Sequence, residues 1–288
     1  MLLCGIDEAR RGPIIGPMVM CGAVIEEENY DSLIKLKPKD SKLLTKNQRE
    51  NIYDKLIATL KGHKTIIIPP KEIDNAVDRK GNLNLNLLEA HKIKDILDEL
   101  RPHKATIDCP SNNIKSYRSY LYNLLENKNI EIKLEHKAEK YPIVAAASII
   151  AKVVGDNEIE KIKKEIGIDF GSGYLHDPKT ISFMKENYEN YPDIFRKSWF
   201  PYQQLVNQKF QKNLLEFTKF LKGAPKESPA IEKLKRLEEF GYRFETPKSV
   251  HELAIMKGPC TVILYKSGKL LIQGNEEIKE AVKKLLNA

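Results

Sequence analysis

The chain has 288 residues, of which 41% are hydrophobic and 31% charged, a balance typical of a globular protein with a full core. Its formal net charge of +8 favours a polyanionic partner or plain solubility, and charge alone does not choose between them. No run approaches the roughly 20 apolar residues of a membrane span, and no signal sequence is evident, so we expect a cytoplasmic protein without a membrane partner. The four cysteines are scattered and are expected to be reduced.

The first predicted element is a buried strand over residues 2–6, which ends in the adjacent carboxylates Asp7 and Glu8. Arg10 and Arg11 follow almost at once. An ionised carboxylate at the end of a buried strand is costly unless it is paired or binds a metal, and neighbouring strand residues point to opposite faces. A strand end neutralised by the arginines and a metal site are both open interpretations of this stretch alone.

Strands and helices then alternate along the chain. Apolar periodicity predicts strands at 14–25, 64–68, 104–108 and 130–134, and helices at 45–60, 85–100, 113–127, 144–166, 178–188 and 201–222. The strand at 104–108 ends in a further acid, Asp108, and the two glycines of 171–174 predict a loop. The alternation indicates an α/β fold with a mixed sheet.

A composition change near Gly223-Ala224-Pro225 predicts a linker. Beyond it the pattern indicates a helix, a short strand, a hairpin and a last helix, at 230–240, 241–245, 260–273 and 275–286. We therefore expect a large domain of residues 1–222, including the helices of about 178–222, and a small α+β module of residues 223–288. A module of this size would be only marginally stable alone.

Acids stand in three places where acids are costly: at Asp7 and Glu8, at Asp108, and at Asp156 on the long helix. If these segments meet at one edge of the sheet, they form a cluster of carboxylate oxygens, which suits hard cations such as Mg²⁺ or Mn²⁺. Two such ions are the usual device for in-line attack on a phosphodiester. In a basic protein this indicates a nucleic-acid substrate.

Five segments, in order over about residues 1–210, together resemble the type 2 ribonucleases H, the ribonuclease HII family, especially its archaeal members: GIDEARRGP (5–13), DSK (40–42), TIDCP (106–110), HKAEKYPIVAAASIIAK (136–152) and GSGYLHDPKT (171–180). The resemblance implies a ribonuclease-H-like fold, with a five-stranded mixed sheet flanked by helices. It also implies an endonuclease in which these acids bind the metal; we expect Mg²⁺ or Mn²⁺ in a two-metal site, and a monomer. Such an enzyme hydrolyses the RNA strand of RNA·DNA hybrids and cleaves 5′ of ribonucleotides embedded in duplex DNA, leaving 5′-phosphate and 3′-hydroxyl ends.

Matched position by position, the resemblance makes four acids the catalytic, metal-binding residues: Asp7, Glu8, Asp108 and Asp156. Asp156 is preferred to Glu158 because it shares one helix face with Ser148 and Lys152. The resemblance and this helix face together indicate these substrate-binding residues: Arg10, Arg11, Gly12, Lys42, Ser148, Lys152 and Tyr174. Arg196 and Lys197 are further candidates for phosphate contacts.

Two departures from the family pattern stand close to the predicted site. Arg10 replaces a glycine, and Gly155 replaces the arginine that usually precedes the last catalytic acid. Because that glycine lets the backbone approach the 2′-OH, we expect weaker discrimination for single embedded ribonucleotides; the guanidinium could instead bind a phosphate or pair with Asp7 or Glu8. The alternative function is a hybrid- or duplex-binding protein whose nuclease activity is weakened by Arg10 and Gly155.

The C-terminal module is similar to part of the TATA-box-binding-protein-like domain of type 3 ribonucleases H, on the segment CTVILYKSGKLLIQG (260–274). This similarity implies a module that holds duplex, with Lys266 and Lys269 nearby. The other interpretation is a small docked domain that stabilises the enzyme.

Overall fold

The structure is a computed structural model that describes residues 1–38, 46–78, 83–208 and 229–287. The chain separates into two compact units, Met1–Leu205 and Val206–Ala288, here named the N-terminal and C-terminal units. The predicted domain boundary after residue 222 falls outside the described residues and stays a prediction.

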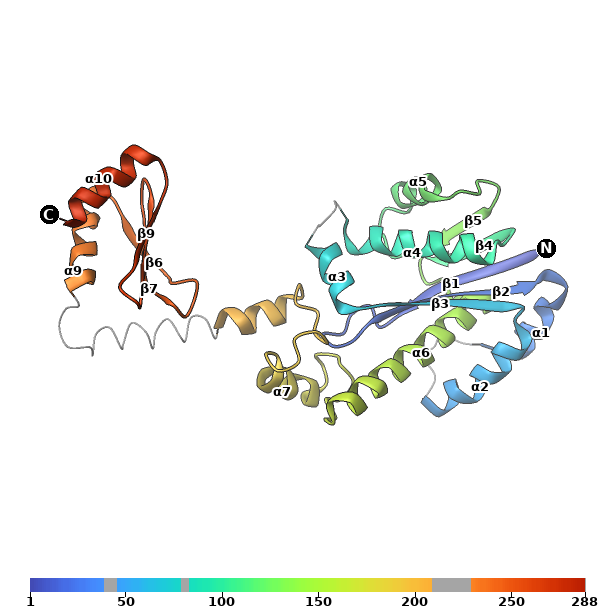
Figure 1. Cartoon of the computed structure of the whole chain (residues 1–288). Helices are drawn as coiled ribbons and strands as arrows, with labels where there is room; N and C mark the ends of the chain where they lie inside the picture. Colours follow the sequence, from blue (N-terminus) through green and yellow to red (C-terminus); the bar gives the residue numbers. More distant parts are fainter. Residues whose placement is uncertain (39–45, 79–82, 209–228, 288) are drawn as a thin grey trace. The chain divides into compact units, whose positions relative to one another are not determined.

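The N-terminal unit is built on a five-stranded sheet in the order β3-β2-β1-β4-β5 (Figure 1). Its strands are β1 (Leu2–Ala9), β2 (Met18–Glu26), β3 (Gly62–Ile68), β4 (Lys104–Asp108) and β5 (Glu131–Glu135). The central strand β1 runs antiparallel to β2 and parallel to β4. The predicted mixed sheet is therefore confirmed.

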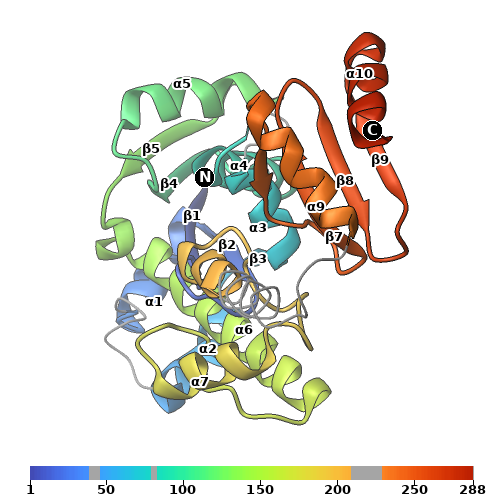
Figure 2. The same cartoon turned by 90° about the vertical axis from the view of Figure 1, so that its left-hand side faces the viewer.

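Helices cover both faces of this sheet (Figures 1 and 2). One face carries α1 (Tyr30–Lys35), α2 (Lys46–Thr59) and α6 (Pro142–Ile166), and the other carries α3 (Pro70–Val77), α4 (Leu85–Leu100) and α5 (Ile114–Leu124). The sequence pattern missed α1 and α3, which are too short for a clear period. Pro70 is the first residue of α3, where its missing N–H leaves no bond unmade.

Helix α6 packs directly on β1. A Cβ atom added at Gly5 would lie 2.4 Å from the carbonyl carbon of Ile143, so only glycine allows this approach. On the helix side, Ala145–Ala147 are fully buried and Ser148 is 3% exposed. The small residues thus bring the helix backbone close to the strand that carries Asp7.

A third core joins the segment before β2 to the end of the unit. Ile14 and Ile15 are buried with Phe170 and Phe183, against α7 (Pro178–Asn187) and the helix at 200–208. The backbone amides of Ile14 and Ile15 both donate to the carbonyl oxygen of Gly173, at 2.9 and 3.3 Å. The predicted strand start at 14 is therefore wrong, because these isoleucines are apolar to fill this core and β2 begins only at Met18.

The C-terminal unit is an antiparallel sheet in the order β6-β7-β8-β9 with α9 and α10 packed on one face. Its elements are α9 (Pro229–Lys235), β6 (Arg243–Glu245), β7 (Glu252–Lys257), β8 (Thr261–Tyr265), β9 (Leu270–Gln273) and α10 (Glu276–Asn287). The predicted hairpin and last helix are confirmed, whereas β7 was not predicted.

Short 3-10 helices lie in both units, at Glu27–Asn29 (η1), Ala138–Lys140 (η4) and Arg236–Phe240 (η5).

Two expectations from composition can be compared with the described residues. None of their helices combines the length and the apolar character needed to cross a bilayer. All four cysteines are buried and unbonded to one another, as expected.

Candidate active site

Three carboxylates meet where β1 and β4 end. The two strands are parallel and Ile6 pairs with Ile107, so the next residues, Asp7 and Asp108, are neighbours. Asp7, Glu8 and Asp108 each place one oxygen within 4.8 Å of the others. The backbone amide of Ala138, in η4, donates to Asp108 at 2.9 Å and holds that side chain. The register of parallel strands thus assembles a cluster of oxygen ligands.

Asp7 is buried, with 3% of its surface exposed. Its Oδ1 accepts a hydrogen bond from the Glu8 amide at 2.8 Å, and the carboxylate is also hydrogen-bonded by Ser148. Its Oδ2 is buried without a hydrogen-bond partner among the described residues. Burial, followed by the negative charges of Asp108 and Glu139, raises the pKa of Asp7 to about 7 against the hydrogen bond from Ser148.

Glu8 points toward the opposite face of the sheet, as alternation on a strand requires. Burial, and then the charges of Asp7 and Glu89, raise the pKa of Glu8 well above its usual range. A bound divalent cation would compensate this excess of negative charge. Asp7 Oδ2, which has no hydrogen-bond partner among the described residues, could then serve as one of its ligands. The donor set, composed only of oxygens, fits Mg²⁺ or Mn²⁺.

Asp156, the fourth predicted ligand, is not part of this cluster. Its carboxylate lies 2.7 Å from Lys152 Nζ, 3.2 Å from Arg49 Nη2 and 3.5 Å from Arg10 Nη1. Cations from three elements thus hold Asp156, and its place as a fourth ligand stays a prediction. The shared face of Lys152 and Asp156 on α6 is confirmed, and Glu158 pairs with Lys161 instead.

Arg10 directs its guanidinium into the protein and is only 4% exposed. Its Nη2 donates to the carbonyl oxygen of Ser172 at 2.8 Å, and its central carbon lies 5.3 Å from the centre of the Tyr174 ring. Burial lowers the pKa of Arg10, and the interactions with Tyr174 and Asp156 act in the opposite direction. The interpretation in which Arg10 pairs with Asp7 or Glu8 is wrong, because its ion pair is with Asp156.

Arg11 points to the other face of the sheet. Its Nε donates to Glu89 at 2.7 Å and its Nη2 donates to the side chain of Asn86 at 2.8 Å. Glu89 is fully buried on α4, and burial raises its pKa although Arg11 lowers it. We did not predict Glu89; the available signal was an acid placed between Leu88 and Ala90, on the stripe that α4 buries.

The loop after β1 is held by Arg196, which is completely buried. Its guanidinium donates to three carbonyl oxygens, those of Arg10 and Arg11 at 2.6 Å each and that of Gly16 at 3.1 Å. Burial lowers the pKa of Arg196 to about 9. The predicted phosphate contact of Arg196 is therefore wrong, because no part of this side chain reaches the surface.

Tyr174 stands on the loop predicted at 171–174, partly exposed, with its ring against Arg10 and His176. Gly173 has a φ of 83°, and a Cβ atom there would lie 2.9 Å from Arg10 Nη2, so glycine is needed for this contact. Asp177 accepts from the backbone amide of Ser172 at 2.7 Å and fixes the loop shape. Gly12 is exposed, and a Cβ atom added there would meet nothing within 4 Å.

The other predicted substrate contacts have different outcomes. Lys42, with the rest of the DSK motif, lies outside the described residues. Ser148 is hydrogen-bonded to Asp7, and Lys152 is paired with Asp156. Contacts of these residues with substrate stay predictions.

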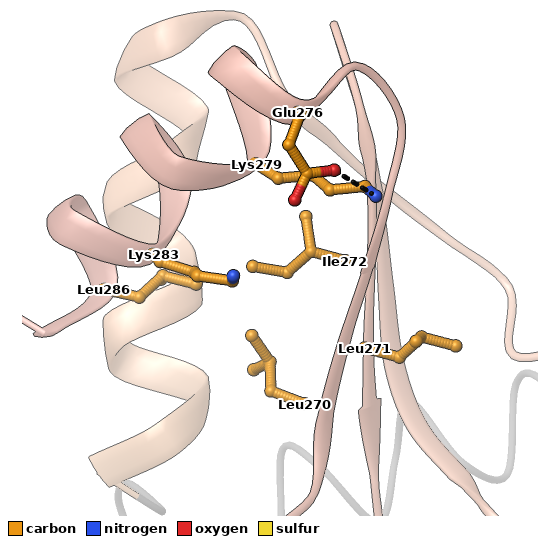
Figure 3. A pocket seen from close by; sticks show the side chains of 7 residues that line it. All are labelled: Leu270, Leu271, Ile272, Glu276, Lys279, Lys283 and Leu286. Carbon is orange, nitrogen blue, oxygen red and sulfur yellow. Dashed lines mark hydrogen bonds and ion pairs between the residues drawn. The ribbon is translucent and has the colours of Figure 1, made fainter.

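The C-terminal unit carries a groove of about 420 Å³ between β9 and α10 (Figure 3). It is lined by Leu270, Leu271, Ile272, Glu276, Lys279, Lys283 and Leu286. Glu276 and Lys279 form an ion pair of 3.0 Å at its rim. An apolar floor with one acid and two lysines offers no groups for phosphodiester hydrolysis, so the carboxylate cluster is the candidate active site.

The sequence model for the family Ribonuclease HII matches residues 4–201. The chain belongs to the ribonuclease HII family. It is 42% identical over 228 residues to the ribonuclease HII of Pyrococcus abyssi, an alignment that covers 77% of this chain and 98% of that protein. A ribonuclease HII of Methanococcus maripaludis is 40% identical over 227 residues, covering 76% and 92% of the two chains. The C-terminal unit lies beyond the family match.

Solved structures show the same relationship. The ribonuclease H2 of Pyrococcus horikoshii is 41% identical, with a TM-score of 0.65 over 72% of this chain and 98% of its own. The ribonuclease HII of Archaeoglobus fulgidus, solved in a complex with PCNA, is 36% identical, with a TM-score of 0.61 over 69% and 95%. Bst-RNase HIII in complex with Mn²⁺, at 21% identity and a TM-score of 0.59 over 72% and 70%, shares the fold.

The chain is therefore a type 2 ribonuclease H, a metal-dependent endonuclease whose substrate class is the RNA·DNA hybrid. The ribonuclease-H-like fold expected from its motifs is confirmed. These matches favour the enzyme over the alternative, a duplex-binding protein with weakened nuclease activity.

Proposed function

We propose that Asp7, Glu8 and Asp108 are the catalytic, metal-binding acids of this ribonuclease HII. The observation that carries the proposal is their convergence within 4.8 Å at the ends of two parallel strands. The raised pKa values of Asp7 and Glu8 support it, as does the Oδ2 of Asp7, which has no hydrogen-bond partner in the described part of the chain, because clustered buried carboxylates need a compensating cation. Asp156 is the proposed fourth ligand, on the helix that also presents Ser148.

The metal is proposed to be Mg²⁺ or Mn²⁺ in a two-ion site. When bound, such ions lower the pKa of an attacking water and stabilise the leaving 3′-oxygen, which yields 5′-phosphate and 3′-hydroxyl ends. The chain itself contributes orientation: the Glu8 amide and Ser148 hold Asp7, and the Ala138 amide holds Asp108. Ligands fixed in this way need little reorganisation when the substrate binds.

We further propose that cleavage takes place 5′ of a ribonucleotide embedded in duplex DNA as well as in continuous hybrids. Recognition of a single 2′-OH requires hydrogen-bonding groups close to the sugar. Gly12 is exposed with free space where a side chain would stand, and Arg11 and Tyr174 lie on the same pair of loops. Of the remaining candidates, Lys42 and Lys152 keep a predicted role in phosphate binding.

The test is cleavage of a labelled DNA duplex with one ribonucleotide, and of a continuous hybrid, with Mg²⁺, Mn²⁺ or EDTA. We expect cleavage only with the metals, and we expect Asp7→Asn or Asp108→Asn to abolish it while duplex binding is kept. Asp95→Asn, an exposed acid on α4, is the matched control and should cleave like the parent. Retained turnover in the Asp7 variant would contradict the assignment, and binding without cleavage by the parent would support the duplex-binding alternative.

For residues 223–288 we propose a duplex-binding role. Strand register places Arg243, Lys257, Thr261 and Gln273 in one row across the sheet. The adjacent row, with Met256 and Val262, faces the core under α9 and α10, so the polar row lies on the opposite face. Exposed donors along a sheet face suit contacts with a phosphate backbone.

The double variant Arg243→Glu/Lys257→Glu should bind duplex more weakly. The slope of the logarithm of the binding constant against the logarithm of the salt concentration (the salt slope) should fall in magnitude by about 2, one for each lost phosphate contact. Lys284→Glu, exposed on α10, is the control and should change neither quantity beyond its effect on net charge. An unchanged salt slope with a lower unfolding midpoint would favour the docked, stabilising domain instead.

The predicted monomeric state and cytoplasmic location stay predictions. Light scattering of the purified chain tests the first, and cell fractionation tests the second. A dimer in solution would contradict the monomer prediction.

A further inference from the structure

Arg10 and Gly155 occupy one volume between β1 and α6. A Cβ atom built on Gly155 would lie 2.7 Å from Cδ and 3.1 Å from Cγ of Arg10. The first distance is shorter than real Cβ contacts, so any residue larger than glycine at 155 would force the arginine stem to move. Conversely, a long side chain that began at 155 would enter the space that the Arg10 stem fills now.

The guanidinium of Arg10 connects three parts of the site. From the end of β1 it reaches Asp156 on α6, the carbonyl oxygen of Ser172, and the Tyr174 ring. A buried cation is costly unless it is paired, and these contacts from different elements supply the pairing. The arginine is thus placed to fix the Tyr174 loop relative to Asp156.

The backbone of Arg10 has a φ of 60°, in the left-handed region that favours glycine. A non-glycine residue there is destabilised locally, so its side-chain contacts must offset the strain. Because the side chain turns inward, it leaves the outer surface of the loop as a glycine would leave it. The structural reason for expecting weaker discrimination, a large cation at that surface, is therefore not found in this conformation.

We propose that Arg10 is a positioning residue that couples the Tyr174 loop to Asp156, and that Arg10 and Gly155 form one functional unit. The two departures from the family pattern then compensate each other. The family pattern has an arginine at position 155 on α6, whereas in this chain Arg10, at the end of β1, supplies the guanidinium. The proposal rests on the proposed function, which places Asp156 and Tyr174 in the site.

The test is a double-mutant cycle in the full chain, with Arg10→Gly, Gly155→Arg and the double exchange. Each single change should lower kcat on the embedded-ribonucleotide duplex on the order of tenfold, with KM little changed. Arg10→Gly unlinks Asp156 from the loop, and Gly155→Arg collides with the Arg10 stem. The double exchange should return kcat to within about threefold of the parent, because one arginine again occupies the shared volume.

Two further variants separate positioning from folding. Arg101→Gly is the matched control, since Arg101 also has left-handed backbone, with a φ of 48°, but is exposed at the end of α4; its kcat should equal the parent's. Arg10→Lys keeps the charge but lacks the planar fork, so its kcat should lie between those of the parent and Arg10→Gly. Unfolding midpoints and duplex affinities in EDTA are measured for every variant.

Losses in kcat that multiply in the double exchange would overturn the proposal. So would a double exchange that recovers its unfolding midpoint but not its kcat, because that result assigns the pair a structural role only. If Gly155→Arg does not fold, the test rests on the two Arg10 variants. The proposal is then overturned if Arg10→Lys and Arg10→Gly both have the kcat of the parent. A parent enzyme that cleaves neither substrate contradicts the proposed function and not the coupling.

Discussion

The acids at the ends of β1 and β4 and the acid on α6 stand in opposite electrostatic surroundings. Asp7, Glu8 and Asp108 crowd within 4.8 Å, and burial and mutual repulsion raise the pKa values of the first two. Asp156 is held by Arg10, Arg49 and Lys152. Negative charge is in excess in the first group, and positive charge is in excess around Asp156. Stability measurements without metal can therefore distinguish the two halves of the proposed site.

The largest expected difference is a gain in stability when Asp7, a proposed catalytic acid, is replaced. Asp7→Asn removes a buried charge that is repelled by its neighbours, so in EDTA at pH 8 it should raise the free energy of unfolding by about 1–3 kcal/mol. Chemical denaturation measures this effect. Added Mg²⁺ should stabilise the parent and should have little effect on the variant, whereas a less stable variant in EDTA would contradict the charge argument.

The same repulsion predicts how stability depends on pH. The folded-state pKa of Asp7 is about 7, above its ordinary value of 3.8, so folding favours the protonated acid. Its contribution to stability is complete below the ordinary pKa and is lost as the pH rises through about 7. Unfolding midpoints in EDTA should therefore fall over this range in the parent, less in Asp7→Asn, and less in the parent with Mg²⁺; equal slopes would contradict the assignment.

Asp156→Asn should act in the opposite direction. The substitution leaves three cations facing one another, so the free energy of unfolding in EDTA should fall by about 1 kcal/mol. Comparison with Asp7→Asn under one condition checks the contrast directly. If both variants shift in the same direction, the two halves of the site do not differ as described.

The smallest effect is expected at Lys152. Lys152→Met removes an i,i+4 ion pair with Asp156 but leaves Arg10 and Arg49 in place, so the loss should be about 0.3–0.5 kcal/mol. Lys161→Met, on the outer face of the same helix, removes an exposed pair with Glu158 and is the matched control. A loss at Lys152 far above that at Lys161 would show that Lys152 is the main partner of Asp156.

The local sequence pattern was sufficient to predict that Asp7 and Asp108 lie at the ends of strands. The apolar run before Asp7 and the short strand before Asp108 are visible in the sequence, and parallel pairing of β1 with β4 then brings the acids together. The shared helix face of Lys152 and Asp156 follows from a period of 3.6 residues. These features depend on neighbours along the chain or on a single strand pairing.

The features that were missed depend on contacts between distant segments. Arg49 reaches Asp156 across 107 positions, and Arg11 reaches Glu89 across 78. Nothing adjacent to Arg196 indicates that its guanidinium is buried, because its acceptors are carbonyl oxygens of another loop. Such partners are not encoded in any local period, so sequence reasoning missed the contact of Arg49 with Asp156 and assigned Arg196 to the surface.

The hydrogen bonds from Arg196 to the loop after β1 determine when that loop can fold during synthesis of the chain. Its acceptors on Arg10, Arg11 and Gly16 lie 186, 185 and 180 positions earlier in the chain. During translation, β1 and β4 can pair once both have left the ribosome, but the loop lacks the three hydrogen bonds from Arg196 until that residue emerges. The nascent chain therefore contains the proposed catalytic acids long before Arg196 can hold the loop after β1, and activity should appear late and abruptly as synthesis nears the end of the N-terminal unit.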